Sequence, residues 1–176
     1  MVFEYEIRSG AIADLPYLAA VERGADAIYP PNILPQNSFT VPIDILKRAL
    51  LHQTLVVAGS LEDDEIVGFA AATPKSKFLH LNQISVLPAY GRRGIGRKLV
   101  TEIVQIAQEK KLSGVTLNTF AHIPWNAPFY QSLGFQALTE ADFEDRPELD
   151  YLKRNLERER AFGLEKRVAM LYPSHS

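Results

Sequence analysis

The sequence predicts an α/β fold built on a mixed β-sheet, and three observations lead to this prediction. Two apolar runs flank a short acidic turn, which is typical of an antiparallel hairpin. A long apolar strand then leads through a turn rich in glycine and arginine into an amphipathic helix. Because another strand follows that helix, the strand–helix–strand unit should form a right-handed crossover with two parallel strands.

The composition is that of a globular protein. The 176 residues are 47% hydrophobic and 23% charged, with a formal net charge of −2, and these values predict one domain over residues 1–176. No apolar signal-peptide core and no run long enough for a membrane span is present, so we expect a cytoplasmic protein without a membrane partner. The slightly acidic charge argues against nucleic acid as the main partner. The lack of cysteine excludes disulfides and a cysteine nucleophile.

The first part of the chain should form a strand followed by two helices. Residues 3–8 alternate between apolar and polar side chains, which predicts a strand. Asp14 is placed to cap the helix that follows, and this helix should end at Tyr29 and the two prolines after it. Residues 30–42 contain four prolines and predict a loop, after which a short helix is expected over residues 43–51.

The later elements follow from the same patterns. An apolar stripe that begins at Ile95 predicts a helix after the glycine turn, and Gly114 should end this helix. A charged, amphipathic helix is marked by Leu149, Leu152 and Leu156. The remaining expectations are strands over residues 54–58, 65–73, 77–86, 115–120 and 166–172, a short helix over residues 124–133, and a frayed tail over residues 173–176.

The strand before the glycine turn has an inconsistent alternation. Leu79 and Leu81 share one parity, whereas Ile84 and Val86 share the other. Either both faces of this strand are buried, or a β-bulge near residues 82–83 changes the register. Bulges are frequent beside active sites, so this strand is a candidate wall of one.

The glycine turn has the layout of an anion site. A strand, a tight turn and a helix start present free backbone N–H groups and the positive end of the helix dipole. Arg92, Arg93 and Arg97 add fixed positive charge, which suits a phosphate group. A loop with solvated arginines is the alternative.

Two nucleotide-binding motifs do not match this turn. A dinucleotide fingerprint needs a third glycine where the chain has Leu99, and a P-loop needs Gly-Lys-Ser/Thr, whereas Gly96 precedes Arg97 and Lys98. A phosphate bound at this turn would therefore belong to a ligand other than a dinucleotide or the nucleotide of a P-loop.

Two segments carry a family resemblance. The pattern V-x-P-x-x-x-R-R-G-I-G-R-x-L at residues 86–99 resembles the acetyl-CoA-binding motif of the GCN5-related N-acetyltransferases (GNAT). The pattern N-A-P-F-Y-x-x-L-G-F at residues 126–135 resembles the second motif of that family. The order of elements over essentially the whole chain is also similar.

The resemblance implies a fold and a donor substrate. It implies a single-domain mixed central sheet with splayed parallel strands and helices on both faces, and acetyl-CoA as the donor, with no metal. The backbone of Ile84, Ser85 and Val86 would pair with the pantetheine arm. Gly91 stands where the family often has Gln or Arg, so one side-chain contact is missing. The groups that would hold the pyrophosphate are those of Arg92, Arg93, Gly94, Ile95, Gly96 and Arg97.

Tyr130 resembles the general acid of the family. The CoA thiolate that leaves needs a proton, and a phenol can supply it. The alternative for Tyr130 is a core tyrosine that packs against Phe135. Asn126 is placed to bind the pantetheine or Tyr130, and it is equally well placed to cap a helix. The usual asparagine of the family corresponds to Ile123 in this chain.

The acceptor amine must lose a proton before it attacks. His80 is the candidate general base, because several members of the family carry Glu or His on this strand, and a structural histidine is the alternative. Glu22, on the apolar face of the first helix, is the alternative candidate for the base and is expected to lie at the substrate. Four further residues are expected in the acceptor pocket, although they could equally form plain core: Tyr29, Phe120, His122 and Trp125. The histidine spacing does not match that of metal ligands.

These observations predict an enzyme that transfers acetyl from acetyl-CoA to a primary amine of a small molecule or a protein. The amine would attack directly in a ternary complex, since no cysteine is available to form an acyl-enzyme, and a backbone N–H near Val86 would hold the oxyanion. The resemblance is compatible with a homodimer. The alternatives are a non-catalytic CoA-binding regulatory module and a nucleic-acid-binding protein.

Overall fold

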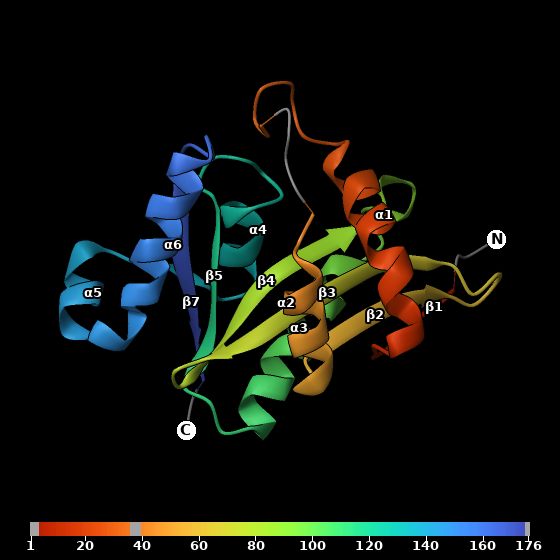
Figure 1. The fold of residues 1–176 in the computed structure, drawn as a ribbon, viewed down its shortest axis with the longest axis horizontal. Coiled ribbons are helices and arrows are strands. Elements are labelled where there is room, and N and C mark those ends of the chain that lie inside the picture. The colour runs from red at the N-terminus through yellow and green to blue at the C-terminus, as the bar shows by residue number, and fades with distance from the viewer. Residues whose placement is uncertain (1–3, 36–39, 175–176) are drawn as a thin grey trace.

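A computed structural model describes residues 4–35 and 40–174 of the chain. Its seven strands form one sheet in the order β1-β2-β3-β4-β5-β7-β6 (Figure 1). Only the β4–β5 pair is parallel, and the other five pairs in the described residues are antiparallel. The strands are β1 (Tyr5–Ser9), β2 (Leu55–Ser60), β3 (Ile66–Lys75), β4 (Phe78–Val86), β5 (Gly114–Phe120), β6 (Gln136–Ala137) and β7 (Arg167–Pro173). The α/β class and the mixed sheet are as predicted.

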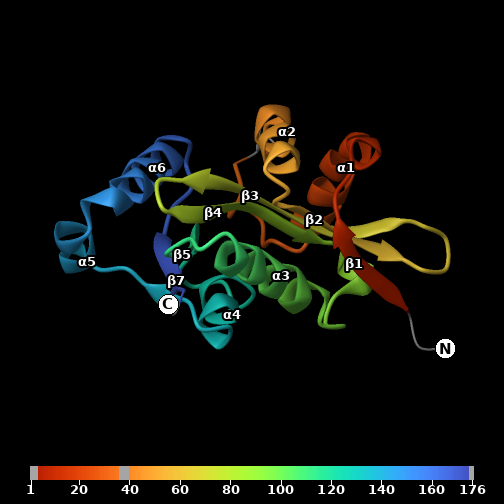
Figure 2. The same ribbon diagram turned by 90° about the horizontal axis from the view of Figure 1, so that it is seen from below.

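Helices cover both faces of the sheet. Figure 2 shows α1, α2 and α6 on one face, with α3 and α4 on the other. The helices are α1 (Leu15–Asp26), α2 (Ile43–Leu51), α3 (Ile95–Glu109), α4 (Ala127–Ser132), α5 (Glu140–Asp145) and α6 (Asp150–Ala161). The two faces therefore offer separate approaches to the middle of the sheet.

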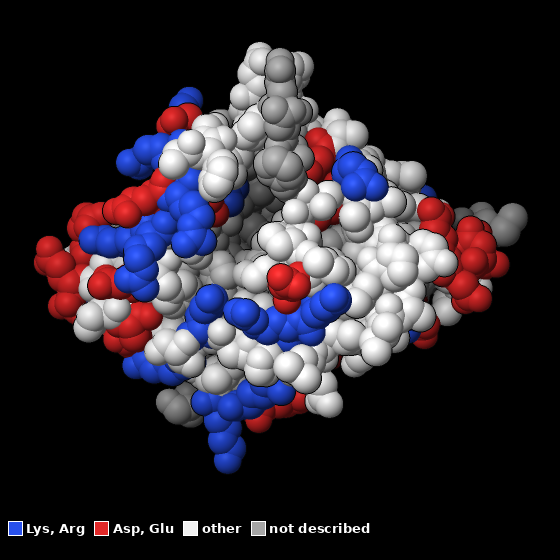
Figure 3. Space-filling view, in the orientation of Figure 1, with Lys and Arg blue, Asp and Glu red and all other residues white. Residues whose placement is uncertain are grey.

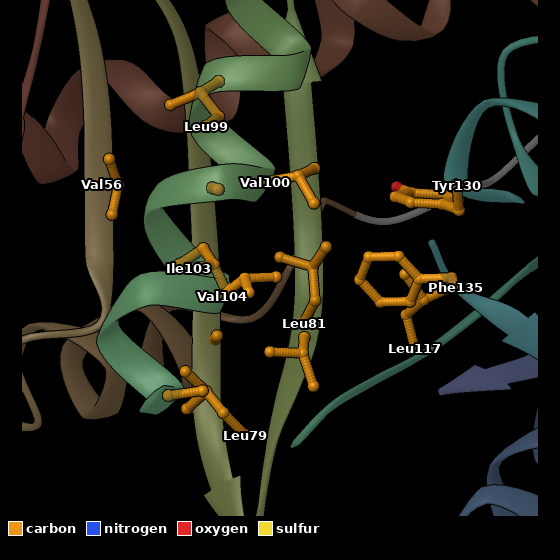
Figure 4. Packing of buried hydrophobic residues seen from close by; sticks show 14 of the residues in the cluster. Val56, Leu79, Leu81, Leu99, Val100, Ile103, Val104, Leu117, Tyr130 and Phe135 are labelled. Carbon is orange, nitrogen blue, oxygen red and sulfur yellow. The ribbon is translucent and has the colours of Figure 1, made fainter. Parts of the chain in front are cut away.

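Helix α3 anchors the larger core. Its buried stripe repeats every three to four residues and includes Leu99 and Ile103, both fully buried. These side chains belong to the same buried cluster as Leu79 and Leu81 of β4 (Figure 4). Burying a leucine or isoleucine contributes about 1.5–3 kcal/mol, so this cluster holds α3 firmly on the sheet.

Strand β4 contains the bulge that its alternation suggested. Its register against β3 shifts between the pairs Ala71↔Gln83 and Ala72↔Leu81, which leaves Asn82 as the extra residue. Thr73 on β3 donates a hydrogen bond from Oγ1 to Asn82 Oδ1 at 2.8 Å. Residues 78–81 are also buried on both faces, so both explanations for the irregular alternation hold.

The two parallel strands separate soon after they meet. Pairing between β4 and β5 is confined to Leu79↔Val115 and His80↔Thr116 in the described residues. Strand β4 continues to Val86 while paired with β3 alone. The splayed strands that the resemblance implied are therefore present.

Several local predictions need correction. Asp14 stands at the N-cap of α1, but its side chain does not cap the helix. Its carboxylate instead accepts hydrogen bonds from Arg8, at 2.7 and 2.8 Å, and from the Ala11 N–H. Pro173 and Ser174 are not frayed: Pro173 pairs with Gly114, and the Ser174 N–H bonds to Ser113.

The remaining differences concern two short elements and the residues that the structure does not describe. The short strand β6 and helix α5 were not predicted, because two residues are too few for a strand pattern and α5 lies in a uniformly charged stretch. Residues 30–35 and 40–42 form turns and extended chain without a helix or strand, as expected of the proline-rich loop. Phe3, residues 36–39 and residues 175–176 lie outside the described residues.

Candidate active site

A cavity of about 580 Å³ lies beside the open end of β4. The end of α1 contributes residues from one face of the sheet, and the starts of α3 and α4 contribute residues from the other (Figure 2). A second cavity, of about 590 Å³, lies between α1 and the start of β3, and of the two motifs it includes only Leu87. The first cavity is lined by Ala25, Asp26, Ile28, Tyr29, Gln83, Ile84, Ser85, Val86, Pro88, Tyr90, Gly91, Arg92, Gly94, Ile95, Gly96, Arg97, Trp125, Asn126, Phe129 and Tyr130.

The glycine turn forms an anion cradle at one end of this cavity. Gly94 is the N-cap of α3 and has a φ of 80°, a left-handed conformation that glycine adopts at little cost. The Lys98 N–H is bonded to the Gly94 carbonyl at 3.0 Å. The amides of Gly96 and Arg97 lie in the first turn before it and so have no carbonyl of the helix to bind. These groups and the helix dipole favour a negatively charged ligand.

The arginines of the turn take different positions. The side chains of Arg92 and Arg97 line the cavity, whereas Arg93 is not among the lining residues. The backbone carbonyl of Arg93 accepts a hydrogen bond from Tyr5 at 3.3 Å. Two of the three predicted arginines therefore add positive charge to the cradle itself.

The β4 wall of the cavity has an unpaired edge. Ile84, Ser85 and Val86 pair with β3 on one side, and in the described residues they pair with no β5 residue on the other. The peptide groups along this edge can bond to an extended ligand as a neighbouring strand would. A linear molecule with amide groups matches this wall.

Tyr130 closes the cavity from α4. Only 5% of its surface is exposed, and its ring packs at 5.6 Å from that of Phe135. Figure 4 shows its hydroxyl turned toward β4. Burial, and to a smaller extent the neighbouring Tyr29, raises the pKa of Tyr130, so the phenol keeps its proton. The side chain thus packs in the core and also presents a hydroxyl to the cavity.

An aromatic and amide cluster lies at the Tyr130 end. The Tyr29 hydroxyl donates a hydrogen bond to Asn126 Oδ1 at 3.1 Å, and the ring of Tyr29 lies 5.8 Å from that of Trp125. Asn126 stands at the N-cap of α4, yet its side chain makes no capping bond. The ring centroids of Phe120 and Tyr29 lie 5.7 Å apart, and Phe120 does not line the cavity.

Three other predicted residues lie outside the cavity wall. His80 is buried, with Nδ1 at 3.1 Å from the Thr116 hydroxyl, and burial lowers its pKa to about 4. Glu22 is buried and accepts a hydrogen bond from the Val41 N–H at 2.9 Å, and burial raises its pKa to about 7. His122 is exposed, with its ring centroid 6.4 Å from that of Phe120.

Two residues near the cavity were not predicted from the sequence. Asp26 lines the cavity one helical turn after Glu22, and that i, i+4 spacing was a usable signal. Arg167 on β7 lies 4.6 Å from the ring centroid of Phe120 and bonds to Glu159. It is distant in sequence, and the patterns along the chain do not connect it with the cavity.

The structure bears on metal and membrane binding only within residues 4–35 and 40–174. In those ranges no group of three or more His, Asp or Glu side chains is arranged to hold a metal ion. None of the helices there is both long and apolar enough to cross a membrane.

Fold and cavity together define an α/β protein with a cavity beside the unpaired end of the central parallel strand β4. The family model described as "Acetyltransferase (GNAT) family" matches residues 26–135. The chain belongs to this family. The matched range contains the glycine turn, the open edge of β4 and Tyr130.

Similar proteins are known from sequence and from structure. Thialysine N-epsilon-acetyltransferase of Bos taurus is 32% identical over 103 residues, which cover 54% of this chain and 59% of the relative. The chain thus spans less than two thirds of that relative's length. Among solved structures, the ribosomal-protein-S18-alanine N-acetyltransferase of Escherichia coli superposes with a TM-score of 0.66 at 19% identity, covering 98% of this chain and 96% of the other. The PaiA N-acetyltransferase of Thermoplasma acidophilum, solved with coenzyme A, gives a TM-score of 0.61 at 17% identity, covering 97% and 99%. These likenesses show that the chain shares their fold.

Proposed function

We propose that this protein is an N-acetyltransferase that moves the acetyl group of acetyl-CoA to a primary amine. The observation that carries the proposal is the cavity beside the open end of β4, which joins an anion cradle to a buried tyrosine hydroxyl. Family membership supports the same chemistry.

The residues of the cavity fit acetyl-CoA, a substrate of the proposed reaction. The amides of Gly94, Ile95, Gly96 and Arg97 would hold its pyrophosphate at the start of α3, with charge from Arg92 and Arg97. The open edge of Ile84, Ser85 and Val86 would pair with the amide-bearing arm. A backbone N–H near Val86 would then stabilise the oxyanion.

Tyr130 would act as the general acid. When the amine attacks the thioester carbon, the C–S bond breaks and the CoA sulfur takes a proton from the phenol. Burial keeps the phenol protonated until the thiolate departs, because it raises the pKa of Tyr130. The hydroxyl is turned toward β4, where the thioester would lie (Figure 4).

The acceptor would approach from the face that carries α1, α2 and α6. Figure 3 shows a hollow in the middle of this face, between the α6 side and the α1–α2 side. Tyr29, Trp125 and Asn126 would line the acceptor end of the cavity. Phe120 and His122 would support this lining from behind.

We assign His80 and Glu22 supporting roles instead of a direct part in the chemistry. His80 bonds to Thr116 at the last parallel pair of the sheet, behind the cavity wall. Glu22 holds the Val41 N–H and so ties the segment before α2 to α1. Both would thus fix walls of the site.

The acceptor is a primary amine of a small molecule or a protein under this proposal. The name of the bovine relative suggests thialysine and lysine as first acceptors to test. The cytoplasmic location and the homodimer stay predictions from the sequence.

An assay of free CoA thiol tests the proposal. Wild-type protein is incubated with acetyl-CoA and, separately, thialysine, lysine, a polyamine and an N-terminal peptide, while thermal unfolding is followed with and without CoA. We expect stabilisation by CoA and amine-dependent thiol release. Stabilisation without release for any amine would instead support the regulatory CoA-binding module, and the lack of both would overturn the proposed function.

A further inference from the structure

Asp26 is a charged residue in the cavity that the proposed mechanism has not used. It is the last residue of α1, and it lines the cavity with Tyr29 and Tyr130. It is partly buried. Within residues 4–35 and 40–174 its carboxylate makes no salt bridge and no side-chain hydrogen bond, which separates it from Glu22 one turn earlier.

In the described residues, the surroundings of Asp26 contain no cation that compensates its charge. Burial raises the pKa of Asp26, which shows that nearby positive charge does not offset its desolvation. Arg92 and Arg97 line the same cavity, but in the described part of the chain neither comes within 4 Å of the carboxylate. A partly buried, unpaired carboxylate is costly, and a cationic ligand would relieve that cost.

Asp26 lies at the acceptor end of the cavity. The Tyr29 N–H donates a hydrogen bond to the Asp26 backbone carbonyl at 3.1 Å, so the two residues share one turn of the chain. Besides burial, the charge of Asp26 contributes to the raised pKa of Tyr29. Tyr29 and Trp125 bring aromatic rings to this end, and such rings also attract cations. A positively charged group entering here would meet both kinds of favourable contact.

We infer that the Asp26 carboxylate receives the ammonium group of the acceptor and takes up the proton that this group must lose before attack. The acceptor class is therefore cationic primary amines. This inference rests on the proposed function and adds to it the residue that selects the acceptor.

The proton balance of the step is complete. One proton passes from the ammonium group to the Asp26 carboxylate, and later from the carboxyl group to solvent. The neutral amine then forms the C–N bond as the C–S bond of the thioester breaks. The Tyr130 proton goes to the sulfur, and the second amine proton returns the phenol to its starting state. Amide, free CoA and one released proton are the products.

The test compares Asp26→Asn with Asp26→Glu and with Asp44→Asn. Asp44 is an exposed acid on α2 that does not line the cavity, so its variant removes the same charge elsewhere. Each variant is assayed with the panel amine that the wild type acetylates fastest and with hydroxylamine, a nucleophile that is mainly uncharged at neutral pH. The uncatalysed hydroxylamine rate is subtracted, and CoA affinity and thermal unfolding are measured in parallel.

For Asp26→Asn we expect kcat/KM with the cationic amine to fall by about 100-fold or more. The rate with hydroxylamine and the CoA affinity should change little. Asp26→Glu should recover part of the loss, and Asp44→Asn should behave as wild type. Unchanged amine turnover in Asp26→Asn, or equal losses with both nucleophiles, would overturn the inference alone. A wild type that acetylates no amine would instead overturn the proposed function.

Discussion

The two ends of β4 differ in what surrounds them. At the first end, Leu79 and His80 pair with β3 on one side and with β5 on the other. At the second end, Ile84 and Val86 pair with β3 alone, and a cavity replaces the neighbouring strand. One strand thus serves as core along its first half and as the wall of a cavity along its second.

The comparison separates two kinds of polar residue. At the paired end, Thr116 lies within hydrogen-bonding distance of both His80 and Tyr151, at 3.1 and 2.6 Å. At the open end, Tyr130 and Asp26 have no side-chain hydrogen bond within the described residues and face the cavity. Buried polar groups that bond to one another stabilise the fold, whereas those left free of protein partners are available to a ligand.

Removing a tyrosine hydroxyl at each end of β4 should give the largest contrast in kcat. Tyr130→Phe removes the proposed acid, so kcat should fall by about 100-fold or more with unchanged CoA affinity. Tyr151→Phe removes only the bond to Thr116, so kcat should be unchanged and the free energy of unfolding should fall by about 1 kcal/mol. Steady-state kinetics and urea unfolding of both variants check this. Equal effects on kcat would break the distinction between the two ends.

Protonation of His80, at the paired end of β4, should make the stability of the protein depend on pH. Folded His80 has a pKa of about 4, whereas an unfolded histidine has one of about 6.5. The unfolded state therefore binds more protons between these values. The contribution of His80 to the free energy of unfolding should then grow as pH rises from 4 to 6.5, by up to about 3 kcal/mol.

Glu22 should have the opposite effect. Its pKa rises to about 7 in the folded protein from a usual value of 4.5, so the folded state binds more protons between those values. Its contribution should be lost as pH rises from 4.5 to 7, again by up to about 3 kcal/mol. The two effects should nearly cancel in the wild type.

Single variants separate these two contributions. In urea unfolding at a series of pH values, Glu22→Gln should become more stable as pH rises from 4.5 to 6.5, and His80→Gln should become less stable. A common slope in both variants and the wild type would contradict the burial of these two groups.

The anion cradle should show the smallest of these effects. Arg97→Ala removes a charged contact to phosphate, so CoA affinity should fall by about tenfold. Lys98→Ala is the matched control, because Lys98 lies 4.8 Å from the Tyr5 ring centroid and does not line the cavity. Calorimetric titration with CoA checks both variants. An equal loss in both would indicate general attraction by positive charge instead of a defined cradle.

Much of the fold followed from the sequence because its signals are local. The stripe from Ile95 predicted α3. The mismatch between Leu81 and Ile84 indicated either two buried faces or a bulge near residues 82–83, and the strand has both features. Local patterns failed where a distant partner decides the outcome. Asp14 was expected to cap α1, but Arg8 on β1 binds its carboxylate.

The site was predicted less completely than the fold. The motif residues from Arg92 to Arg97 and Tyr130 could be named as candidates because each motif is continuous along the chain, and their roles stay predictions. His80 was proposed as the general base, and that role stays a prediction. The alternation of its strand could not reveal that its ring is buried against Thr116, because Thr116 lies on another strand. Asp26 was not predicted: its spacing from Glu22 placed it on the same helical face, but that it lines the cavity is visible only in three dimensions.

Hydrogen–deuterium exchange with and without acetyl-CoA tests the central claim most directly, because it reads the backbone at both ends of β4. The account predicts slower exchange in peptides covering Ile84–Val86 and Arg92–Arg97 when acetyl-CoA is bound. Peptides covering Phe78–Leu81 should be unchanged, since those amides are already paired on both sides or enclosed in the core. Protection confined to residues 78–81, or no protection at either end at saturating acetyl-CoA, would contradict the account.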